Sequence, residues 1–239
     1  MKEFLFYKPE ASGVDWKRID SLRHVMEKRT ASICSQRALL YTESFQSSEH
    51  EPYIIRKAKA FAHTLAHMDI YIQKHSLIFG NQASANFAAP IFPEYSMQWV
   101  IDELDSFDQR SGDVFQIDEA VKQDLRSIAP YWLHHTHEDA VNARLSEDIR
   151  LAEKQGVLHR GGISMSGDGH IVPDHEMILK RGFRSLIEEA QEALQGSGLD
   201  ENQRNYYEAV IISLEGALTF FRRYAKLAEE LAEKEADEK

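Results

Sequence analysis

The 239-residue sequence contains a single cysteine, Cys34. One thiol cannot form a disulfide within the chain, and such scarcity is typical of proteins from reducing compartments. The sequence also lacks any run approaching the about 20 apolar residues of a membrane span, and its start, MKEFLFYKPEAS, has no apolar stretch of signal-peptide length. These absences predict a soluble cytoplasmic protein that does not enter a membrane and in which Cys34 is a buried, inert thiol.

Positive charge is also scarce. The chain has 28 Lys and Arg residues against 39 Asp and Glu residues, a formal net charge of −11. Nucleic acids and acidic membranes are bound by clustered basic side chains, so we expect neither as a partner. With 43% hydrophobic and 28% charged residues, the composition is that of an ordinary globular protein able to bury a core.

Common catalytic signatures are missing, including GxSxG, the phosphate-binding loop and the dinucleotide-binding glycine motif. Three histidines, His134, His135 and His137, lie close together in PYWLHHTHEDA and could bind zinc with Glu138 or Asp139. Their spacing does not place all three on one helical face. We therefore expect polar surface residues near a helix start and no metal site, with a small metal-binding helical protein as an open alternative.

Apolar periodicity predicts that most of the chain is helical. Pro52 suits the first position of one helix, and Asp118 suits the N-cap of another. The last helix should carry a buried seam and end in a solvated, charged tail. The expected apolar faces are Ile54, Ala58, Phe61, Ala62 and Leu65; Met97, Val100, Ile101 and Leu104; Val121, Leu125 and Ile128; and, as the seam, Tyr207, Ile211, Leu214, Leu218, Phe221, Ala225 and Ala228.

Two stretches lack helical periodicity. Residues 68–97 contain short β-prone pieces, from which we predict a hairpin between Ile70–Ile72 and Leu77–Phe79. The second stretch, GGISMSGDGHIVPDHEMIL, is rich in glycine. It either holds something small and polar at His170 or is a connection in which His170 caps the helix that begins near Pro173. A carboxylate–imidazole site formed by His170 and His175 with Asp168 and Asp174 also stays open.

A series of motifs, in order and at matching spacing, resembles the N-terminal part of glycyl radical enzymes. This is the pyruvate formate-lyase superfamily, and specifically its glycerol- and diol-dehydratase-like branch. The resemblance runs from about Ile33 to Glu233. The motifs are Gln36-Arg37-Ala38, TES at Thr42–Ser44, EP followed by IRKAKA, LIFGNQAS, AAPIFPEYS, WVIDELD, an R-x-x-D-x-F-like pattern at Arg110–Phe115, PYW at Pro130–Trp132, and GHIVPDHEMILKRGF.

The resemblance implies a mainly α fold with a few short strands, the helical N-terminal portion of a ten-stranded α/β barrel. Residues 1–239 would form the N-terminal part of a pyruvate formate-lyase-type domain, with residues 1–30 as a variable extension. In the family, a radical stored on a glycine passes to a cysteine, which abstracts hydrogen from the substrate. In the dehydratase-like branch, water, an amine or sulfite then leaves.

The implied cofactor is a glycyl radical, installed by an activating enzyme with an iron–sulfur cluster and S-adenosylmethionine. The implied partners are that enzyme, the missing C-terminal portion and further copies of the chain in a homo-oligomer. The sequence ends before the family's catalytic cysteine and its RVxGY-like glycine loop. We therefore expect no catalytic residue here and a truncated product, half of a split enzyme or an excised fragment, inactive alone. A non-catalytic helical remnant that binds a partner, and formate acetyltransferase-type C–C cleavage, are the alternatives.

The resemblance also assigns a role to His170, which matches a histidine that hydrogen-bonds a substrate hydroxyl in this branch. Imidazole can donate and accept near neutral pH, and the flanking glycines permit close approach of the backbone. Some diol-handling relatives carry a polar amide where this chain has Gly162, which argues against a simple glycerol-like substrate. The Asn81–Gln82 and Ala89–Glu94 segments are expected to brace the barrel.

Overall fold

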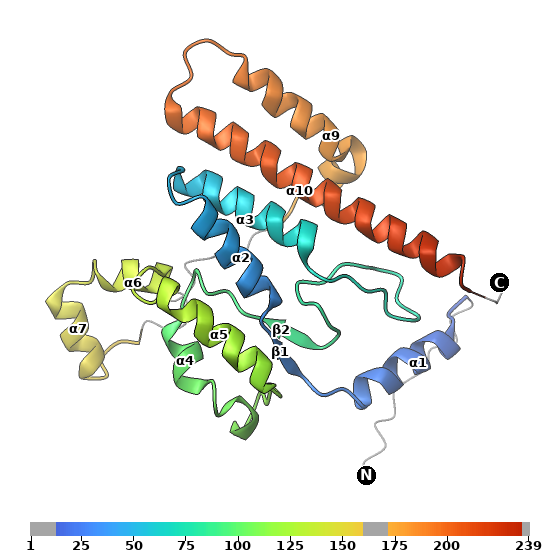
Figure 1. Ribbon diagram of the computed structural model, residues 1–239, viewed down its shortest axis with the longest axis horizontal. Coiled ribbons are helices and arrows are strands. Elements are labelled where there is room, and N and C mark those ends of the chain that lie inside the picture. The colour runs from blue at the N-terminus through green and yellow to red at the C-terminus, as the bar shows by residue number, and fades with distance from the viewer. Residues whose placement is uncertain (1–12, 160–171, 236–239) are drawn as a thin grey trace.

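The computed structural model describes residues 13–159 and 172–235, and these residues form a mainly helical fold with two short strands, as predicted. None of the helices in these two ranges is long and apolar enough to cross a membrane. The elements, labelled in Figure 1, are α1 (Trp16–Glu27), β1 (Ser32–Cys34), α2 (Gln36–Ser47), α3 (Tyr53–His67), β2 (Ala88–Pro90), α4 (Gln98–Glu103), the 3-10 helix η1 (Phe107–Gln109), α5 (Glu119–Trp132), α6 (His137–Asn142), α7 (Glu147–Lys154), α9 (His175–Leu194) and α10 (Glu201–Ala232).

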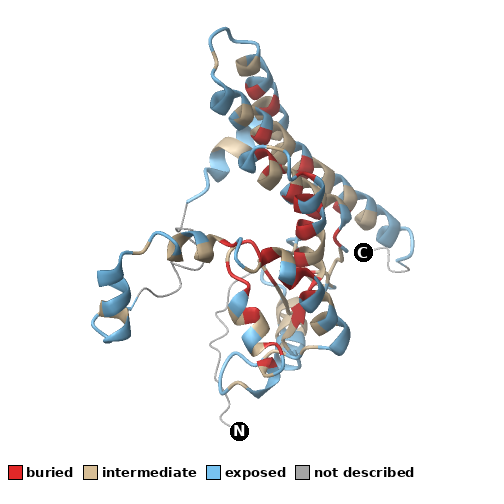
Figure 2. Ribbon diagram, turned by 60° about the vertical axis from the view of Figure 1, so that its left-hand side comes forward, coloured by how far each residue is buried: buried red, intermediate tan, exposed pale blue. Residues whose placement is uncertain are grey.

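The helices form two groups that meet at α2 and α3. In one group, α10 packs along α3 and pairs with α9; in the other, α2 packs on α5, and α4 lies beside α5 (Figure 1). The buried residues concentrate in these two contact zones, whereas α7 stands apart and is largely exposed (Figure 2). The main core consists of Ile33, Ala38, Tyr41, Phe45, Ala60, Ile91, Met97, Val100, Leu104, Phe107, Leu125, Ile128, Ala129 and Trp132.

Most of the predicted helices are confirmed, with small changes at their ends. The helix expected after Pro52 is α3, and Pro52 is its N-cap rather than its first residue. Asp118 is the N-cap of α5, although its side chain makes no capping hydrogen bond. Met97, Val100 and Leu104 are buried around α4, as are Leu125 and Ile128 on α5, so those two apolar faces are also confirmed. Helix α9 starts at His175, close to the position expected from the sequence.

The predicted apolar seam of α10 is wrong. Its expected member Phe221 is 54% exposed, whereas the buried residues of this helix are Ala209, Gly216 and Tyr224. The reason is a close crossing with α3, because a Cβ atom on Gly216 would lie 2.7 Å from the Cα of Ala62. Small residues permit this approach. The larger apolar residues are displaced to the sides, where Phe221 stacks on Phe183 of α9 at a ring distance of 5.6 Å.

The predicted face of α3 needs a similar correction. Ile54 and Phe61 are exposed, whereas Ile55 and Ala60 are buried along with the expected Ala58. Helix α3 lies between α2 and α10 (Figure 1), so it has two contact faces rather than one stripe.

The predicted hairpin is also wrong, because Ile70–Ile72 and Leu77–Phe79 are not strands. The strand of this region is β2, which pairs in parallel with β1 in the register Ser32 with Ala88, Ile33 with Ala89 and Cys34 with Pro90. Partners more than 50 residues apart cannot be recognised from local alternation.

Candidate functional site

The predicted substrate-binding residue His170 lies outside the described residues, as do Gly162 and Asp168. The structure does describe the helix that follows. The carboxylate of Asp174 accepts a hydrogen bond from the backbone N–H of Met177 at 2.9 Å, which makes Asp174 the N-cap of α9. The capping role that the sequence left open for His170 therefore belongs to Asp174.

The histidine cluster lies at the start of α6, as expected. His134 has a left-handed backbone with φ of 76°. The ring Nδ1 of His135 is 3.2 Å from the carbonyl of Tyr131, and His137 is the first residue of α6 after the Thr136 cap. Within residues 13–159 and 172–235, no group of three His, Cys, Asp or Glu residues could hold a metal ion.

The segment after β2 is held by a buried ion pair. Two guanidinium nitrogens of Arg37, on α2, donate to the carboxylate of Glu94 at 2.6 and 3.1 Å. The guanidinium also lies over the ring of Phe92, with its carbon 3.8 Å from the ring centroid, and over Tyr41 at 4.6 Å. Burial, with the nearby Glu94 carboxylate, raises the pKa of the Tyr41 phenol well above its usual value, so Tyr41 stays neutral in this cluster.

The N-terminus of α6 binds the same segment from the other side. The backbone N–H of His137 donates to the carbonyl of Glu94, and that of Glu138 donates to the carbonyl of Tyr95, both at 3.0 Å. These groups are two of the otherwise unpaired donors at a helix start. Residues 89–96 are therefore fixed between α2 and α6, whereas the expected bracing of the barrel by Ala89–Glu94 stays a prediction.

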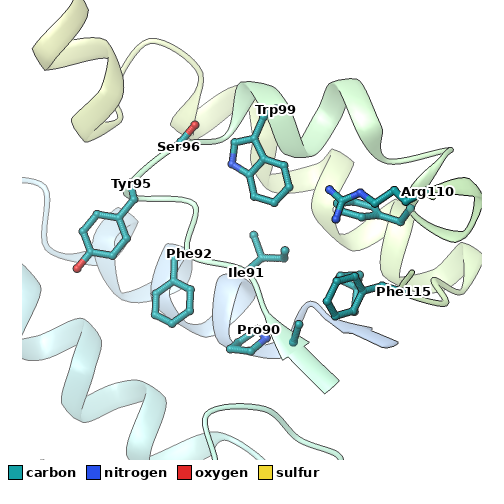
Figure 3. Close-up of a pocket in the computed structure, with 11 residues that line it drawn as sticks. Pro90, Ile91, Phe92, Tyr95, Ser96, Trp99, Arg110 and Phe115 are labelled. Atoms are coloured by element: carbon teal, nitrogen blue, oxygen red, sulfur yellow. The ribbon is translucent and has the colours of Figure 1, made fainter. Parts of the chain in front are cut away.

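This fixed segment forms one wall of an open cavity of about 470 Å³, shown in Figure 3. The floor is the face of the sheet that carries Ile33 and its register partner Ala89. The rings of Trp99 and Phe115 and the side chain of Arg110 stand around it (Figure 3). The full lining is Ile33, Ala89, Pro90, Ile91, Phe92, Tyr95, Ser96, Trp99, Phe107, Arg110 and Phe115.

Two polar side chains of the lining are already engaged by neighbouring groups. The hydroxyl of Ser96 donates to the carboxylate of Glu138. The Nε of Arg110 donates to Glu103 at 2.8 Å, while its guanidinium carbon lies 4.5 Å from the centroid of the Phe107 ring. Because both side chains are engaged in this way and most of the lining is aromatic or aliphatic, the cavity is suited to an apolar group.

Cys34 is buried, as predicted, and lies at the end of β1. Its sulfur is 3.2 Å from the hydroxyl of Ser84 and 3.5 Å from the backbone nitrogen of the same residue. A thiol enclosed in this way does not fit the role of a cysteine that must reach a substrate.

Sequence reasoning missed the cavity, although its residues were quoted. Arg110 and Phe115 are the two ends of the R-x-x-D-x-F-like pattern, and Pro90–Ser96 lie in AAPIFPEYS. A signal was therefore present in the density of aromatic and apolar residues in these two motifs. The motifs are brought to one place by the pairing of β1 with β2 on one side and with Gln116 on the other, and this pairing could not be read from the sequence.

Comparison with known proteins gives matches over most of this chain. A family model described as Pyruvate formate lyase-like matches residues 15–239. Among curated proteins, the (2S)-3-sulfopropanediol dehydratase of Klebsiella oxytoca is 33% identical over 233 residues. The isethionate sulfite-lyase of Nitratidesulfovibrio vulgaris is 31% identical over 234 residues. Each alignment covers 92% of this chain and 28% of the relative.

A solved structure agrees. The glycerol-bound form of the B12-independent glycerol dehydratase from Clostridium butyricum superimposes with a TM-score of 0.89 and 33% identity. That match covers 97% of this chain and 30% of the dehydratase. The chain therefore spans less than a third of the length of the relatives it matches.

Proposed function

Because the chain belongs to the pyruvate formate lyase-like family, we propose that it is the N-terminal portion of a glycyl radical lyase of the dehydratase-like kind. The observation that carries this proposal is the superposition of 97% of the chain on a glycerol dehydratase at 33% identity. The proposed reaction is the radical elimination of water or another leaving group from a small hydroxylated substrate. Two relatives, a dehydratase and a sulfite-lyase, support elimination chemistry.

The proposed contribution of this chain to the site is His170, as a hydrogen-bonding group for a substrate hydroxyl. Asp174 supplies the cap of the helix that follows, so His170 is not needed for that purpose. An imidazole can both donate and accept a hydrogen bond near neutral pH, and Gly169 directly before it leaves room for close approach. Gly162, in place of a polar amide, favours a substrate other than glycerol itself.

The radical machinery is assigned to the remainder of the enzyme. The relatives' glycyl radical would supply hydrogen abstraction, but the only cysteine of this chain, Cys34, is buried against Ser84. We therefore assign hydrogen abstraction to residues outside this chain. The proposed partners are the C-terminal portion of the polypeptide, an activating enzyme with an iron–sulfur cluster and S-adenosylmethionine, and further copies in a homo-oligomer. Cytoplasmic location and a variable extension over residues 1–30 stay predictions.

A chimera tests the proposal. The chain replaces the matching part of the Clostridium butyricum glycerol dehydratase, and the product is activated anaerobically with the activating enzyme of that dehydratase. We expect a glycyl radical doublet by EPR and elimination from at least one compound of a panel of small diols and hydroxysulfonates. A folded chimera that carries the radical but turns over none of the panel would contradict the proposed elimination chemistry.

A further inference from the structure

The two-stranded sheet is asymmetric in its hydrogen bonding. Strand β1 has a neighbour on each side: β2 on one, and on the other Gln116, whose carbonyl accepts the N–H of Ile33 at 3.0 Å and whose N–H donates to Ala31 at 2.8 Å. The only strand paired with β2 in the described part of the chain is β1. The outer edge of β2 is therefore the open edge of this sheet.

The register shows which groups lie on that edge. In a parallel ladder, alternate residues direct both of their backbone polar groups to the same neighbour. The N–H of Ser32 donates to the carbonyl of Phe87 at 3.1 Å, so Phe87 and Ala89 face β1 and Ala88 faces outward. Pro90, also outward, has a carbonyl but no N–H to offer. A further strand that pairs with this edge of β2 would therefore form its backbone hydrogen bonds with the N–H and C=O of Ala88.

Such a sheet is unusual by itself. Parallel strands occur almost only in sheets that are covered on both faces, and an isolated pair of strands is marginally stable in water. Here the face that carries Ile33 and Ala89 opens into the apolar cavity of about 470 Å³ (Figure 3). An open edge and an unfilled apolar cavity thus adjoin the same strand.

We propose that in the assembled enzyme a β-strand from the remainder of the polypeptide pairs with the outer edge of β2 at Ala88. An apolar side chain of that strand enters the cavity between Trp99 and Phe115. This inference rests on the proposed function. In the relatives, more than two thirds of the sequence lies outside the part that this chain matches, and that part would supply the strand. The apolar lining selects an apolar side chain, and the engagement of Arg110 with Glu103 removes the charge that would favour an anionic one.

The test uses binding in trans. The probe is the part of the Clostridium butyricum glycerol dehydratase that lies beyond the region matched by this chain, expressed as a separate polypeptide. Ala89→Phe fills the cavity from its floor and should weaken binding about tenfold or more, the effect expected of an important interface position. The matched control is Ala140→Phe on α6, at an exposed alanine outside the cavity, which should bind as the unchanged chain does.

A second measurement does not depend on a variant. Amide hydrogen exchange of the unchanged chain should show the Ala88 N–H slowed about tenfold or more in the complex. If the unchanged chain fails to bind a probe that circular dichroism shows to be folded, this inference is overturned, whereas the proposed elimination chemistry is decided separately by turnover of the chimera. If the unchanged chain binds but Ala88 exchange is unaltered, or if Ala140→Phe weakens binding as much as a folded Ala89→Phe does, only the present inference is overturned.

Discussion

The guanidinium of Arg37 and the carboxylate of Glu94 form a two-pronged ion pair inside the main core, with side-chain exposures of 13% and 3%. The pair joins α2 to the segment that follows β2. Removing the charge of one partner leaves the other buried without compensation. Glu94→Gln should therefore lower the free energy of unfolding by about 3 kcal/mol, measured by urea denaturation.

The control for this prediction is an exposed pair on α10, Lys226 and Glu230, whose charged atoms are 3.7 Å apart. Exposed pairs within one helix contribute little, so Glu230→Gln should leave the urea midpoint nearly unchanged. Similar losses for Glu94→Gln and Glu230→Gln would show that the buried pair does not hold the segment.

Gly216 is predicted to be essential for the crossing of α10 over α3. An alanine inside a helix is normally about 1 kcal/mol more favourable than glycine. At this position the added Cβ would lie 2.7 Å from both the Cα and the Cβ of Ala62, and the helices would have to separate. Gly216→Ala should instead lower the free energy of unfolding by about 1–3 kcal/mol.

A loop glycine provides the matched control for Gly216→Ala. A Cβ on Gly112 would meet nothing within 4 Å, and its φ is not positive. Gly112→Ala should therefore be neutral or slightly stabilising when both variants are measured by urea denaturation. Stabilisation by Gly216→Ala would mean that the two helices do not approach as closely as the structure shows.

A buried hydrogen bond links α2 to α5. The indole N–H of Trp132 donates to the hydroxyl of Thr42 at 2.7 Å, and both residues are buried. Thr42→Val keeps the shape but leaves the indole N–H without an acceptor, which should cost about 1–3 kcal/mol. The control is Thr219→Val on α10, at a half-buried position where the hydroxyl donates to the carbonyl of Glu215, one turn earlier. Equal effects of the two substitutions would contradict the prediction.

The helices could be predicted from the sequence where the local pattern of apolar and capping residues agrees with the packing in the fold. Pro52, Asp118 and the residues around His175 mark helix starts by their own backbone chemistry. The buried face of a helix could not be predicted where a contact with residues far away in the sequence determines it. Ala62 is 154 residues from Gly216 along the chain, and their contact decides which face of α10 is covered. The periodic pattern of large apolar residues therefore predicted the wrong buried face for α10.

The strands and the cavity show the same limitation. The strand at Ala88–Pro90 is a three-residue segment with little β propensity, and it exists because β1 binds it from far away in the sequence. The motifs around Arg110 and Pro90 were recognised as family features, but their meeting at one cavity follows only from the pairing of β1 with β2 and with Gln116. His170 was singled out by its glycine-rich surroundings and its resemblance, and its role stays a prediction.

The isolated chain should acquire no glycyl radical. Its sequence has no RVxGY-like glycine, and Cys34 is enclosed by Ser84. The measurement is EPR after anaerobic incubation with an activating enzyme, a reductant and S-adenosylmethionine, with the full-length Clostridium butyricum dehydratase as the positive control. A stable glycyl doublet on this polypeptide alone would refute the assignment of the radical machinery to the remainder of the enzyme.

The most direct test of the central claim, that this chain supplies part of the substrate site of a glycyl radical lyase, is the turnover of the activated chimera with and without His170→Ala. Loss of a hydrogen bond to developing charge should cost roughly 2–4 kcal/mol of transition-state stabilisation, about a hundredfold or more in rate. The radical content by EPR and the thermal midpoint should stay unchanged. Turnover that survives His170→Ala intact, or a fall in turnover fully explained by unfolding, would contradict the claim.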